Sequence, residues 1–422
     1  MSDKKKVALI GTGMDGSHTL TADASKYIEK AQVLIGSSRM LRQVNPGERE
    51  VFCSYQKEEI RAFILSSNKE RFAVLFSGDT GFYSAASGLW PLLTDCEVIL
   101  IPGIPSISYF SSRIGVSWED AVLLSLHGKE GNLALLTAKN PKLFCLAGRD
   151  PSELCRHLAE FGLSDVTVTI GENLGLPDEH ITAGRPSELV GKTFSPLSVL
   201  CIENPHAGDE VMLGLSEESL VRGHVPVTKE EVRAVTLAKL HLKKDSCVFD
   251  IGAGTGSVSV EAAWIADRGT VFAVEKNPEA AELLFANRQK FCTDNIRIVE
   301  GSAPAALQGL PSPDAVFIGG SGGHLTEILD DLFTRYSGFH LVLNLITLEG
   351  VSEAVRYFHE RTELSCDWEI AQVFTARGRQ AGTMHLMMGQ NPVTIISGWF
   401  GAGKEAEDGK TDIAHRDEER LR

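Results

Sequence analysis

The stretch that decides the fold is Cys247–Val248–Phe249–Asp250–Ile251–Gly252–Ala253–Gly254–Thr255–Gly256. A short apolar run is followed by an acid and by three glycines at alternate positions, and a helical pattern begins directly afterwards. This order predicts a buried parallel strand, a tight turn without Cβ atoms, and the start of a helix. Because such a turn lets the backbone approach a ligand closely, the identity of that ligand decides the function.

Two acidic residues indicate which ligand this turn holds. Asp250 precedes the glycines Gly252, Gly254 and Gly256, and Glu275 ends the next predicted strand. A carboxylate beside the glycines would repel a pyrophosphate, whereas S-adenosylmethionine carries a sulfonium and an amino group and no phosphate. A carboxylate at the end of the second strand can accept hydrogen bonds from ribose hydroxyls. The pattern therefore favours an S-adenosylmethionine-dependent methyltransferase over an NAD-dependent enzyme.

A run of five small residues, 319–323, follows the strand predicted at 314–318. Such residues add little packing, so they predict either a close approach of the backbone to a ligand or a flexible substrate loop. We take Gly320, Ser321 and Gly322 as substrate-binding candidates. Further upstream, Thr228 and Glu231 form a Thr-x-x-Glu pattern, which predicts a helix with Thr228 as its N-cap.

Three strand-like runs of the N-terminal half also end in glycine-rich or serine-rich turns. The runs are 7–10, 72–76 and 98–101, and the turns are 11–16, 77–84 and 102–110. Because ligands bind at the carboxyl ends of strands in open α/β sheets, these turns predict a second ligand site. The glycine spacing alone would suggest a dinucleotide, but no acid follows the next strand at 33–35, which argues against that interpretation.

Together these residues resemble the tetrapyrrole (corrin/porphyrin) methylase family over about 6–203. The shared motifs are the N-terminal Gly-x-Gly, Leu20–Thr21–x–x–Ala24, Ser77–Gly78–Asp79 with Tyr83, and Pro102–Gly103–x–x–Ser106. The resemblance implies an S-adenosylmethionine site in a cleft between two α/β lobes, with cofactor contacts from Gly11, Gly13, Gly78, Asp79, Tyr83 and Ser106. The family often has proline after the Gly-Asp pair, where this chain has Thr80.

The C-terminal half resembles the precorrin or cobalt-precorrin methyltransferases that also decarboxylate their substrate. The matching segments are 226–233, 250–256, 275–280, 300–304, 319–323, 376–379, 382–384 and 391–393. By this resemblance Thr228, Ser302 and Ala303 contact the cofactor together with Asp250, the three glycines and Glu275. Ser302 stands where aspartate is common in the family, so adenine contacts are expected to rely on backbone groups or on Ala303.

The two resemblances together imply a substrate of the precorrin-6B or precorrin-6Y type, or its cobalt form, in cobalamin biosynthesis. The N-terminal half would methylate C5. The C-terminal half would methylate C15 and release carbon dioxide from the ring C (C12) acetate. Because the substrate carries many carboxylates, we expect cations in its cleft, and the candidates are Arg377 and Arg379 for catalysis and Arg233 for substrate binding. His324, beside the glycine loop, is a candidate for proton handling.

The expected fold class is α/β. A two-lobed tetrapyrrole methylase fold precedes a Rossmann-like class I S-adenosylmethionine-dependent methyltransferase domain. We expect the first domain at 1–207, with lobes at about 1–117 and 118–207, a linker at 208–224, and the second domain at 225–400. The charged tail 401–422 has few apolar residues, which predicts disorder.

The composition limits the partners. The chain has 422 residues and a formal net charge of −15, which argues against a nucleic-acid backbone as partner. No apolar run reaches the roughly 20 residues of a membrane helix, and the first apolar run is too short for a signal peptide. The eight cysteines are scattered without a Cys-x-x-Cys pair, so we expect reduced thiols and no metal site. We therefore expect a cytoplasmic protein, and the family resemblances imply a homo-oligomer that acts on a small tetrapyrrole.

Three alternatives stay open at this point. The chain could be a methyltransferase pair for another tetrapyrrole or for RNA, although its acidity and lack of a basic stripe count against RNA. The N-terminal half could be a non-catalytic scaffold or an oligomerisation module. An NAD-dependent reductase is the third possibility. Calorimetric titration of the isolated halves with S-adenosylmethionine and with NAD distinguishes a methyltransferase from a scaffold and from an NAD-dependent reductase.

Overall fold

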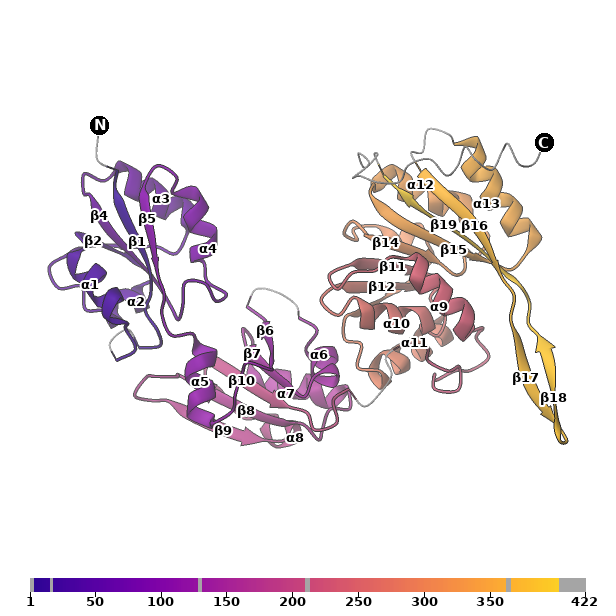
Figure 1. The fold of residues 1–422 in the computed structure, drawn as a ribbon, viewed down its shortest axis with the longest axis horizontal. Helices are drawn as coiled ribbons and strands as arrows, with labels where there is room; N and C mark the ends of the chain where they lie inside the picture. The colour runs from indigo at the N-terminus through magenta and orange to yellow at the C-terminus, as the bar shows by residue number, and fades with distance from the viewer. Residues whose placement is uncertain (1–3, 16–17, 128–130, 209–212, 362–365, 402–422) are drawn as a thin grey trace. The chain divides into compact units, whose positions relative to one another are not determined.

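The chain folds into two compact units, residues 1–208 and 209–422. The computed structural model describes residues 4–15, 18–127, 131–208, 213–361 and 366–401. The tail that the sequence predicts to be disordered lies outside the described residues, apart from Gly401. Each unit is built from β-sheets covered by helices, which confirms the predicted α/β class (Figure 1).

The first unit begins with a five-stranded parallel sheet of order β3-β2-β4-β1-β5. Its strands are β1 (Lys6–Gly11), β2 (Val33–Gly36), β3 (Glu50–Cys53), β4 (Arg71–Phe76) and β5 (Glu97–Ile101). Helices α1 (Ala22–Lys30) and α2 (Ser38–Gln43) pack on the face formed by alternate strand residues such as Ala8 and Ile10. The opposite face, which includes Val7 and Leu9, packs against α3 (Lys57–Ser66), α4 (Ala86–Leu89) and the segment that follows η1 (Trp90–Leu92). The strand period of two thus places apolar residues on both faces.

A second, mixed sheet of order β6-β7-β10-β8-β9 completes this unit. Its strands are β6 (Val122–Ser125), β7 (Lys142–Leu146), β8 (Thr167–Glu172), β9 (His180–Gly184) and β10 (Ser198–Glu203). Its helices are α5 (Ser106–Ile114), α6 (Leu133–Lys139), α7 (Pro151–Glu160) and α8 (Pro186–Leu189). Residues of α6, α7 and α8 share one core cluster with the sheet, while Ile107 and Phe110 of α5 pack against Phe144 and Cys201 in another.

The second unit contains a seven-stranded sheet of order β13-β12-β11-β14-β15-β19-β16. The first five strands in this order run parallel, and β19 is antiparallel to both of its neighbours. The strands are β11 (Cys247–Ile251), β12 (Thr270–Glu275), β13 (Ile296–Glu300), β14 (Ala315–Ile318), β15 (Phe339–Leu345), β16 (Cys366–Val373) and β19 (Val393–Phe400). The helices are α9 (Glu230–Lys239), α10 (Ser257–Ile265), α11 (Pro278–Lys290), η2 (Ala305–Leu307), α12 (Leu325–Arg335) and α13 (Leu348–Glu360).

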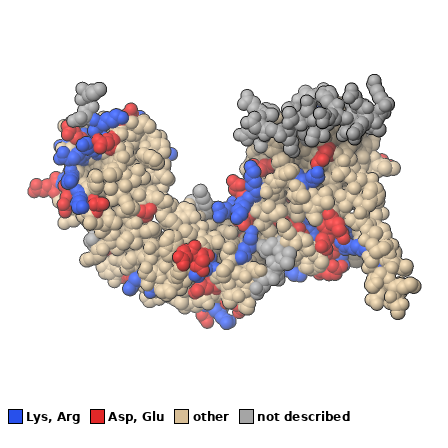
Figure 2. Space-filling view, viewed as in Figure 1, with Lys and Arg blue, Asp and Glu red and all other residues tan. Residues whose placement is uncertain are grey.

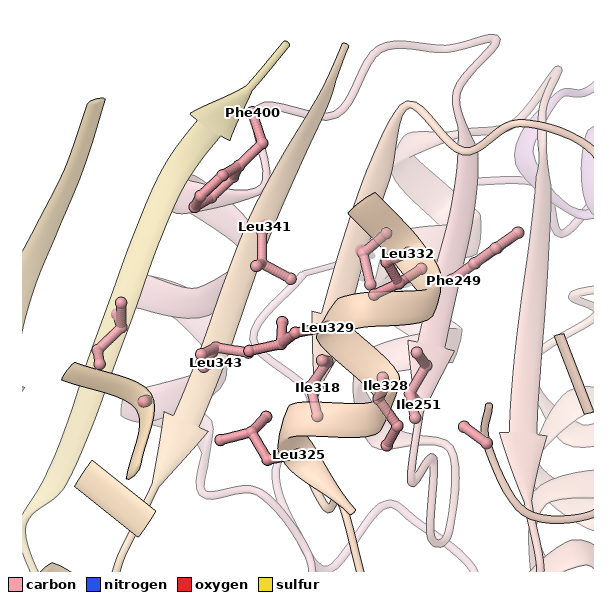
Figure 3. Close-up of a cluster of buried hydrophobic side chains, with 14 of the residues drawn as sticks. Phe249, Ile251, Ile318, Leu325, Ile328, Leu329, Leu332, Leu341, Leu343 and Phe400 are labelled. Carbon is pink, nitrogen blue, oxygen red and sulfur yellow. The ribbon is translucent and has the colours of Figure 1, made fainter. Parts of the chain in front are cut away.

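Helix α12 shows how the sequence pattern produces the core of this unit. Its apolar residues Leu325, Ile328, Leu329 and Leu332 recur at the spacing of one helical face, and each is at most 2% exposed. Figure 3 shows this face directed at the strands that carry Ile251, Ile318 and Leu343. Helices α9, α10 and α11 cover the opposite face of the sheet (Figure 1). The sheet is therefore buried on both sides, as parallel sheets require.

Two features of this unit differ from the sequence prediction. Strand β19 was not predicted, although it lies between β15 and β16. The apolar run 383–388 by itself predicts a single strand, whereas residues 376–389 form an exposed two-stranded arm, in which β17 (Ala376–Ala381) pairs with β18 (Met384–Gly389). The pattern of apolar residues does not predict the structure here, because the arm has no buried face and its apolar residues do not belong to a core.

The predicted capping box at Thr228 is wrong. Helix α9 begins at Glu230 with Lys229 as its N-cap residue, and no side chain caps it. The two residues of the pattern have other roles. Thr228 lines a cavity and its carbonyl accepts a hydrogen bond from Arg233, while the carboxylate of Glu231 binds Arg377.

No helix among the described residues is long and apolar enough to cross a membrane. On the face shown in Figure 2, acidic and basic side chains lie intermixed.

Candidate active sites

The second unit contains a cavity of about 990 Å³ at the carboxyl ends of its parallel strands. Parallel α/β sheets bind ligands at this edge. Many of the residues selected from the sequence line it: Thr228, Gly252, Gly254, Glu275, Ser302, Ala303, Gly320, Ser321, Gly322 and Arg377. The structure thus brings together segments that are far apart in the chain, and the ligand contacts of these residues stay predictions.

The glycine turn after β11 has a geometry that only glycine satisfies easily. Gly252 has φ +74°, and a Cβ atom there would lie 2.5 Å from the carbonyl oxygen of Gly320. This close approach joins the turns after β11 and β14. Gly256 has a different role, because its Cβ atom would lie 2.0 Å from Leu284 Cδ1 on α11. Gly256 therefore lets two helices approach, and it does not line the cavity.

Glu275 presents a carboxylate at the edge of the cavity. One oxygen accepts a hydrogen bond from the amide of Gly254 at 2.8 Å, and the other accepts from the amide of Asn277 at 2.8 Å. Each carboxylate oxygen has two lone pairs, so both oxygens retain capacity for a further donor. The backbone thereby fixes the direction in which this carboxylate can bind hydroxyl groups.

Asp250 lies behind the turn and does not line the cavity. Its side chain is completely buried, and burial raises the pKa of the carboxyl to about 7. The hydrogen bond with the Ser259 hydroxyl opposes this shift, and the charge of Glu275 adds to it. The contact of Asp250 with the cofactor therefore stays a prediction, since its carboxyl does not line this cavity.

Arg377 lines the cavity, but it is held by two carboxylates. Its Nε and Nη2 atoms donate to Glu231 at 2.9 and 2.8 Å, and its Nη1 atom lies 2.9 Å from Glu217. Glu217 is buried and also pairs with Lys229 at 2.6 Å. The hydrogen bonds with Glu231 are the main cause that raises the pKa of Arg377. Lys229 and Lys276 also line the cavity, so it is rich in cations despite the acidic chain.

Three other sequence candidates lie outside this cavity. Arg233 is fully buried and bonds to Glu261, with 2.6 Å between Nε and Oε1, so it does not reach a substrate in this structure. Arg379 is exposed on β17. His324 is the N-cap residue of α12, is half exposed, and lies 3.8 Å from Glu327.

The first unit has a smaller cavity of about 260 Å³. It is lined by segments that follow the strands of the first sheet and by residues of the second sheet and its connections, and it includes the predicted Gly78, Asp79, Tyr83 and Ser106. Gly11 and Gly13 do not line this cavity, but they hold together the turns that surround it. Gly13 and Gly78 exchange backbone hydrogen bonds of 3.0 and 2.9 Å, and a Cβ atom at Gly11 would lie 2.6 Å from Gly103 N. The three predicted turns therefore converge.

Two lining residues fix the loops of this cavity. Asp79 accepts hydrogen bonds from the amides of Gly81 and Gly103, at 2.8 and 2.9 Å. Tyr83 has φ +45°, and its hydroxyl donates to the carbonyl of Leu123 on β6 at 3.1 Å. The side chain of Tyr83 thus connects the turn after β4 to the second sheet.

The sequence interpretation missed three lining cations, Arg39, Lys229 and Lys276. All three follow signals that it did use, and Lys276 directly follows Glu275. Arg39 lies three positions after the end of β2, at the same sheet edge as the glycine turns, and Lys229 is the neighbour of Thr228. A search of every predicted strand end for cations would have found Arg39.

Comparison with known proteins agrees with this two-part organisation. Residues 6–190 match the tetrapyrrole (corrin/porphyrin) methylases, and residues 222–399 match the precorrin methyltransferase domain. A precorrin-6Y C(5,15)-methyltransferase [decarboxylating] from Sinorhizobium sp is 30% identical over 404 residues, which cover 93% of this chain and 95% of the relative.

Other relatives match less than half of this chain. A probable cobalt-precorrin-6B C(15)-methyltransferase (decarboxylating) from Pyrobaculum calidifontis is 40% identical, over 44% of this chain and 95% of that protein. A crystal structure of a precorrin-6Y C5,15-methyltransferase from Geobacter metallireducens is 38% identical and covers 45% of this chain and 99% of that chain, with a TM-score of 0.43. On the match along nearly its whole length, this chain belongs to the precorrin-6Y C5,15-methyltransferase (decarboxylating) family.

Proposed function

We propose that this chain transfers methyl groups from S-adenosylmethionine to C5 and C15 of precorrin-6Y/6B, or of its cobalt form, in cobalamin biosynthesis. In the same pathway step it releases the ring C acetate carboxylate as carbon dioxide. The observation that carries the proposal is the similarity to one relative, named for both positions, over 93% of this chain.

The two units are assigned separate methylations. Relatives that match less than half of this chain are named for C15 methylation with decarboxylation, and the precorrin methyltransferase domain matches residues 222–399. We therefore assign C15 and the decarboxylation to residues 225–400, and C5 to residues 1–207. This division requires one S-adenosylmethionine site in each unit.

The residues of the larger cavity fit S-adenosylmethionine. Glu275 retains lone pairs for the two ribose hydroxyls, and the turn at Gly252 and Gly254 offers backbone without Cβ atoms. Ser302 and Ala303 line the same cavity, where adenine would lie beside the ribose. Its volume, about 990 Å³, is at the upper end of small-molecule pockets. It therefore has room for the cofactor and for part of a second reactant.

The chemistry asks the chain mainly for alignment. Bound S-adenosylmethionine supplies an electrophilic methyl group on a sulfonium. An electron-rich tetrapyrrole carbon attacks this methyl group directly, so no side-chain nucleophile is required. When the acetate loses carbon dioxide, the conjugated ring accepts the electron pair, and a proton replaces the carboxyl group. The walls of the cavity hold the reactants in register and exclude water.

The smaller cavity supports a second site in the first unit. Gly78, Asp79, Tyr83 and Ser106 line it, and the backbone bonds of Gly13 and the carboxylate bonds of Asp79 hold its turns in place. Ser106 is the first residue of α5, so its backbone amide belongs to the free amino end of a helix.

Incubation of the full chain with precorrin-6B and isotopically labelled S-adenosylmethionine tests the proposal by product mass. We expect two labelled methyl groups and the loss of one carbon dioxide. Gly254→Arg, which fills the larger cavity, is expected to leave only the C5 methylation, and Gly78→Arg, which fills the smaller cavity, to leave only the C15 reaction. No label in the product of the wild-type chain would overturn the proposal, and a single methyl group at C15 would make the first unit a scaffold.

A further inference from the structure

Arg39 is a cation of the smaller cavity that neither the motifs nor the family similarity singled out. It lies on α2, whose N-cap Ser37 accepts a hydrogen bond from the amide of Met40. Met40 and Leu41 are buried in the core beneath this helix. The short helix is thereby fixed against the sheet, and Arg39 is placed at the cavity, where its Nη2 atom lies 3.3 Å from the Ser77 hydroxyl.

Among the residues that the structure describes, no carboxylate lies within ion-pair distance of the Arg39 guanidinium. Asp79 lines the same cavity, but both of its oxygens accept backbone amides of Gly81 and Gly103. Burial alone lowers the pKa of Arg39, because no neighbouring acid compensates for the lost water. Arg377 of the other unit shows the contrast, since two glutamates surround it.

We propose that Arg39 binds a carboxylate of the ligand that enters the smaller cavity. A partly buried guanidinium presents several donors, and a carboxylate is the anion that matches them in pairs. This inference rests on the proposed function of the first unit. Two carboxylate sources then exist: the methionine part of S-adenosylmethionine and the acetate and propionate groups of the tetrapyrrole. The chemistry recognised by Arg39 is the same for both.

The test uses the full chain with Gly254→Arg, so that only the smaller cavity is available to the cofactor. In this background Arg39→Gln removes the charge, Arg39→Lys keeps it without the paired donors, and Arg42→Gln is the control. Arg42 lies on the same helix, is exposed, and does not line the cavity. Calorimetry measures the binding of S-adenosylmethionine and of decarboxylated S-adenosylmethionine, and product mass gives KM and kcat for the single methylation.

Arg39→Gln is expected to weaken the binding of one ligand at least ~10-fold, which is the effect of losing a hydrogen bond to a charged group. If the methionine carboxylate is the partner, binding of S-adenosylmethionine weakens and that of the decarboxylated analogue does not. If the tetrapyrrole is the partner, both cofactor affinities persist, while KM for the tetrapyrrole rises and kcat is kept. The affinity or KM that changes in the Arg39→Gln protein is expected to take an intermediate value in the Arg39→Lys protein. The Arg42→Gln protein is expected to match the Gly254→Arg background.

Equal cofactor affinity, KM and kcat in the Arg39→Gln and Arg42→Gln proteins would overturn the inference about Arg39 and leave the proposed function intact. A different result would reject the proposed function itself. If the protein with Arg39 intact neither bound S-adenosylmethionine in the smaller cavity nor methylated the tetrapyrrole once, the first unit would not be a methyltransferase, and the inference would fall with it.

Discussion

The carboxylate of Glu275 accepts a hydrogen bond from the backbone amide of Gly254, with 2.8 Å between Oε2 and N. Glu275 ends β12, and Gly254 lies in the turn after β11, so this bond joins two adjacent strand ends. The other carboxylate oxygen accepts from Asn277 in the next turn. The acid is therefore oriented before a ligand arrives, which reduces the ordering cost of binding.

Glu275→Gln is expected to weaken S-adenosylmethionine binding in the larger cavity by ~10-fold or more, because the amide is uncharged and presents one oxygen to the ribose. Calorimetry on the full chain with Gly78→Arg measures this site alone. Glu282→Gln is the matched control, since Glu282 is exposed on α11 and does not line the cavity. Equal affinity of both variants would exclude Glu275 as a cofactor ligand.

Gly252→Ala is expected to lower the Tm and to weaken cofactor binding, because the new Cβ atom would lie 2.5 Å from the Gly320 carbonyl at a backbone φ of +74°. Gly320→Ala is the comparison. No atom lies within 4 Å of a Cβ atom at Gly320, so its Tm should match that of the wild-type chain. Thermal unfolding of the three proteins checks this difference, and equal Tm values would contradict the close approach.

Arg377→Gln is expected to raise KM for the tetrapyrrole at the larger cavity several-fold. The substitution leaves Glu217 and Glu231 beside the cavity without their shared cation, and negative charge there repels an anionic substrate. Arg379→Gln on the same strand should have no such effect, because Arg379 does not line the cavity. Steady-state kinetics of the C15 methylation compares the two, and similar changes in both would point to the arm as a whole.

Arg233→Met is expected to destabilise the second unit by ~3–5 kcal/mol, the usual cost of leaving one member of a buried ion pair alone. The two side chains are 0% and 2% exposed, and Glu261 also accepts backbone amides of Gly214 and Leu215. Urea denaturation measures the loss. Lys26→Met breaks the exposed pair with Asp23 and should change stability by less than about 1 kcal/mol. Comparable losses in the two variants would contradict the assignment of Arg233 to the core.

Asp250 is expected to make the wild-type chain less stable as pH rises. The pKa of its carboxyl is about 7 in the folded chain and about 3.8 when exposed, so the folded state binds an extra proton between these values. Stability from this group is therefore complete below about pH 4 and is lost as pH rises to 7. Asp250→Asn removes the titration.

Between pH 5 and pH 8, the Asp250→Asn protein should gain up to about 3 kcal/mol relative to the wild-type chain. Urea denaturation of both proteins at the two pH values checks this, and the difference between them isolates Asp250 from all other groups. The same stability difference at both pH values would show that the Asp250 carboxyl does not titrate in this range.

Much of the fold follows from local patterns in the sequence. The apolar runs that end in glycine turns predicted β1, β4, β5 and β11, and the structure places the turns of the first three together as expected. Strand β19 was not predicted because it pairs with β15 and β16, while the exposed arm of β17 and β18 separates it from β16 in the sequence. Its register depends on partners that no local period reveals.

The sequence by itself determined where backbone approaches backbone. The spacing of Gly252 and Gly254 and the acid at Glu275 specify a turn and a carboxylate at one sheet edge, because a missing Cβ atom and the length of a strand are local properties. Only the tertiary structure decided which arginines are paired with carboxylates. Arg377 meets Glu231 across 146 residues of sequence, Arg233 is enclosed in the core, and Arg39 lines a cavity in which the carboxylate of Asp79 binds backbone amides. Burial and ionic partners arise from segments packed together across the chain, so they appear only in the folded protein.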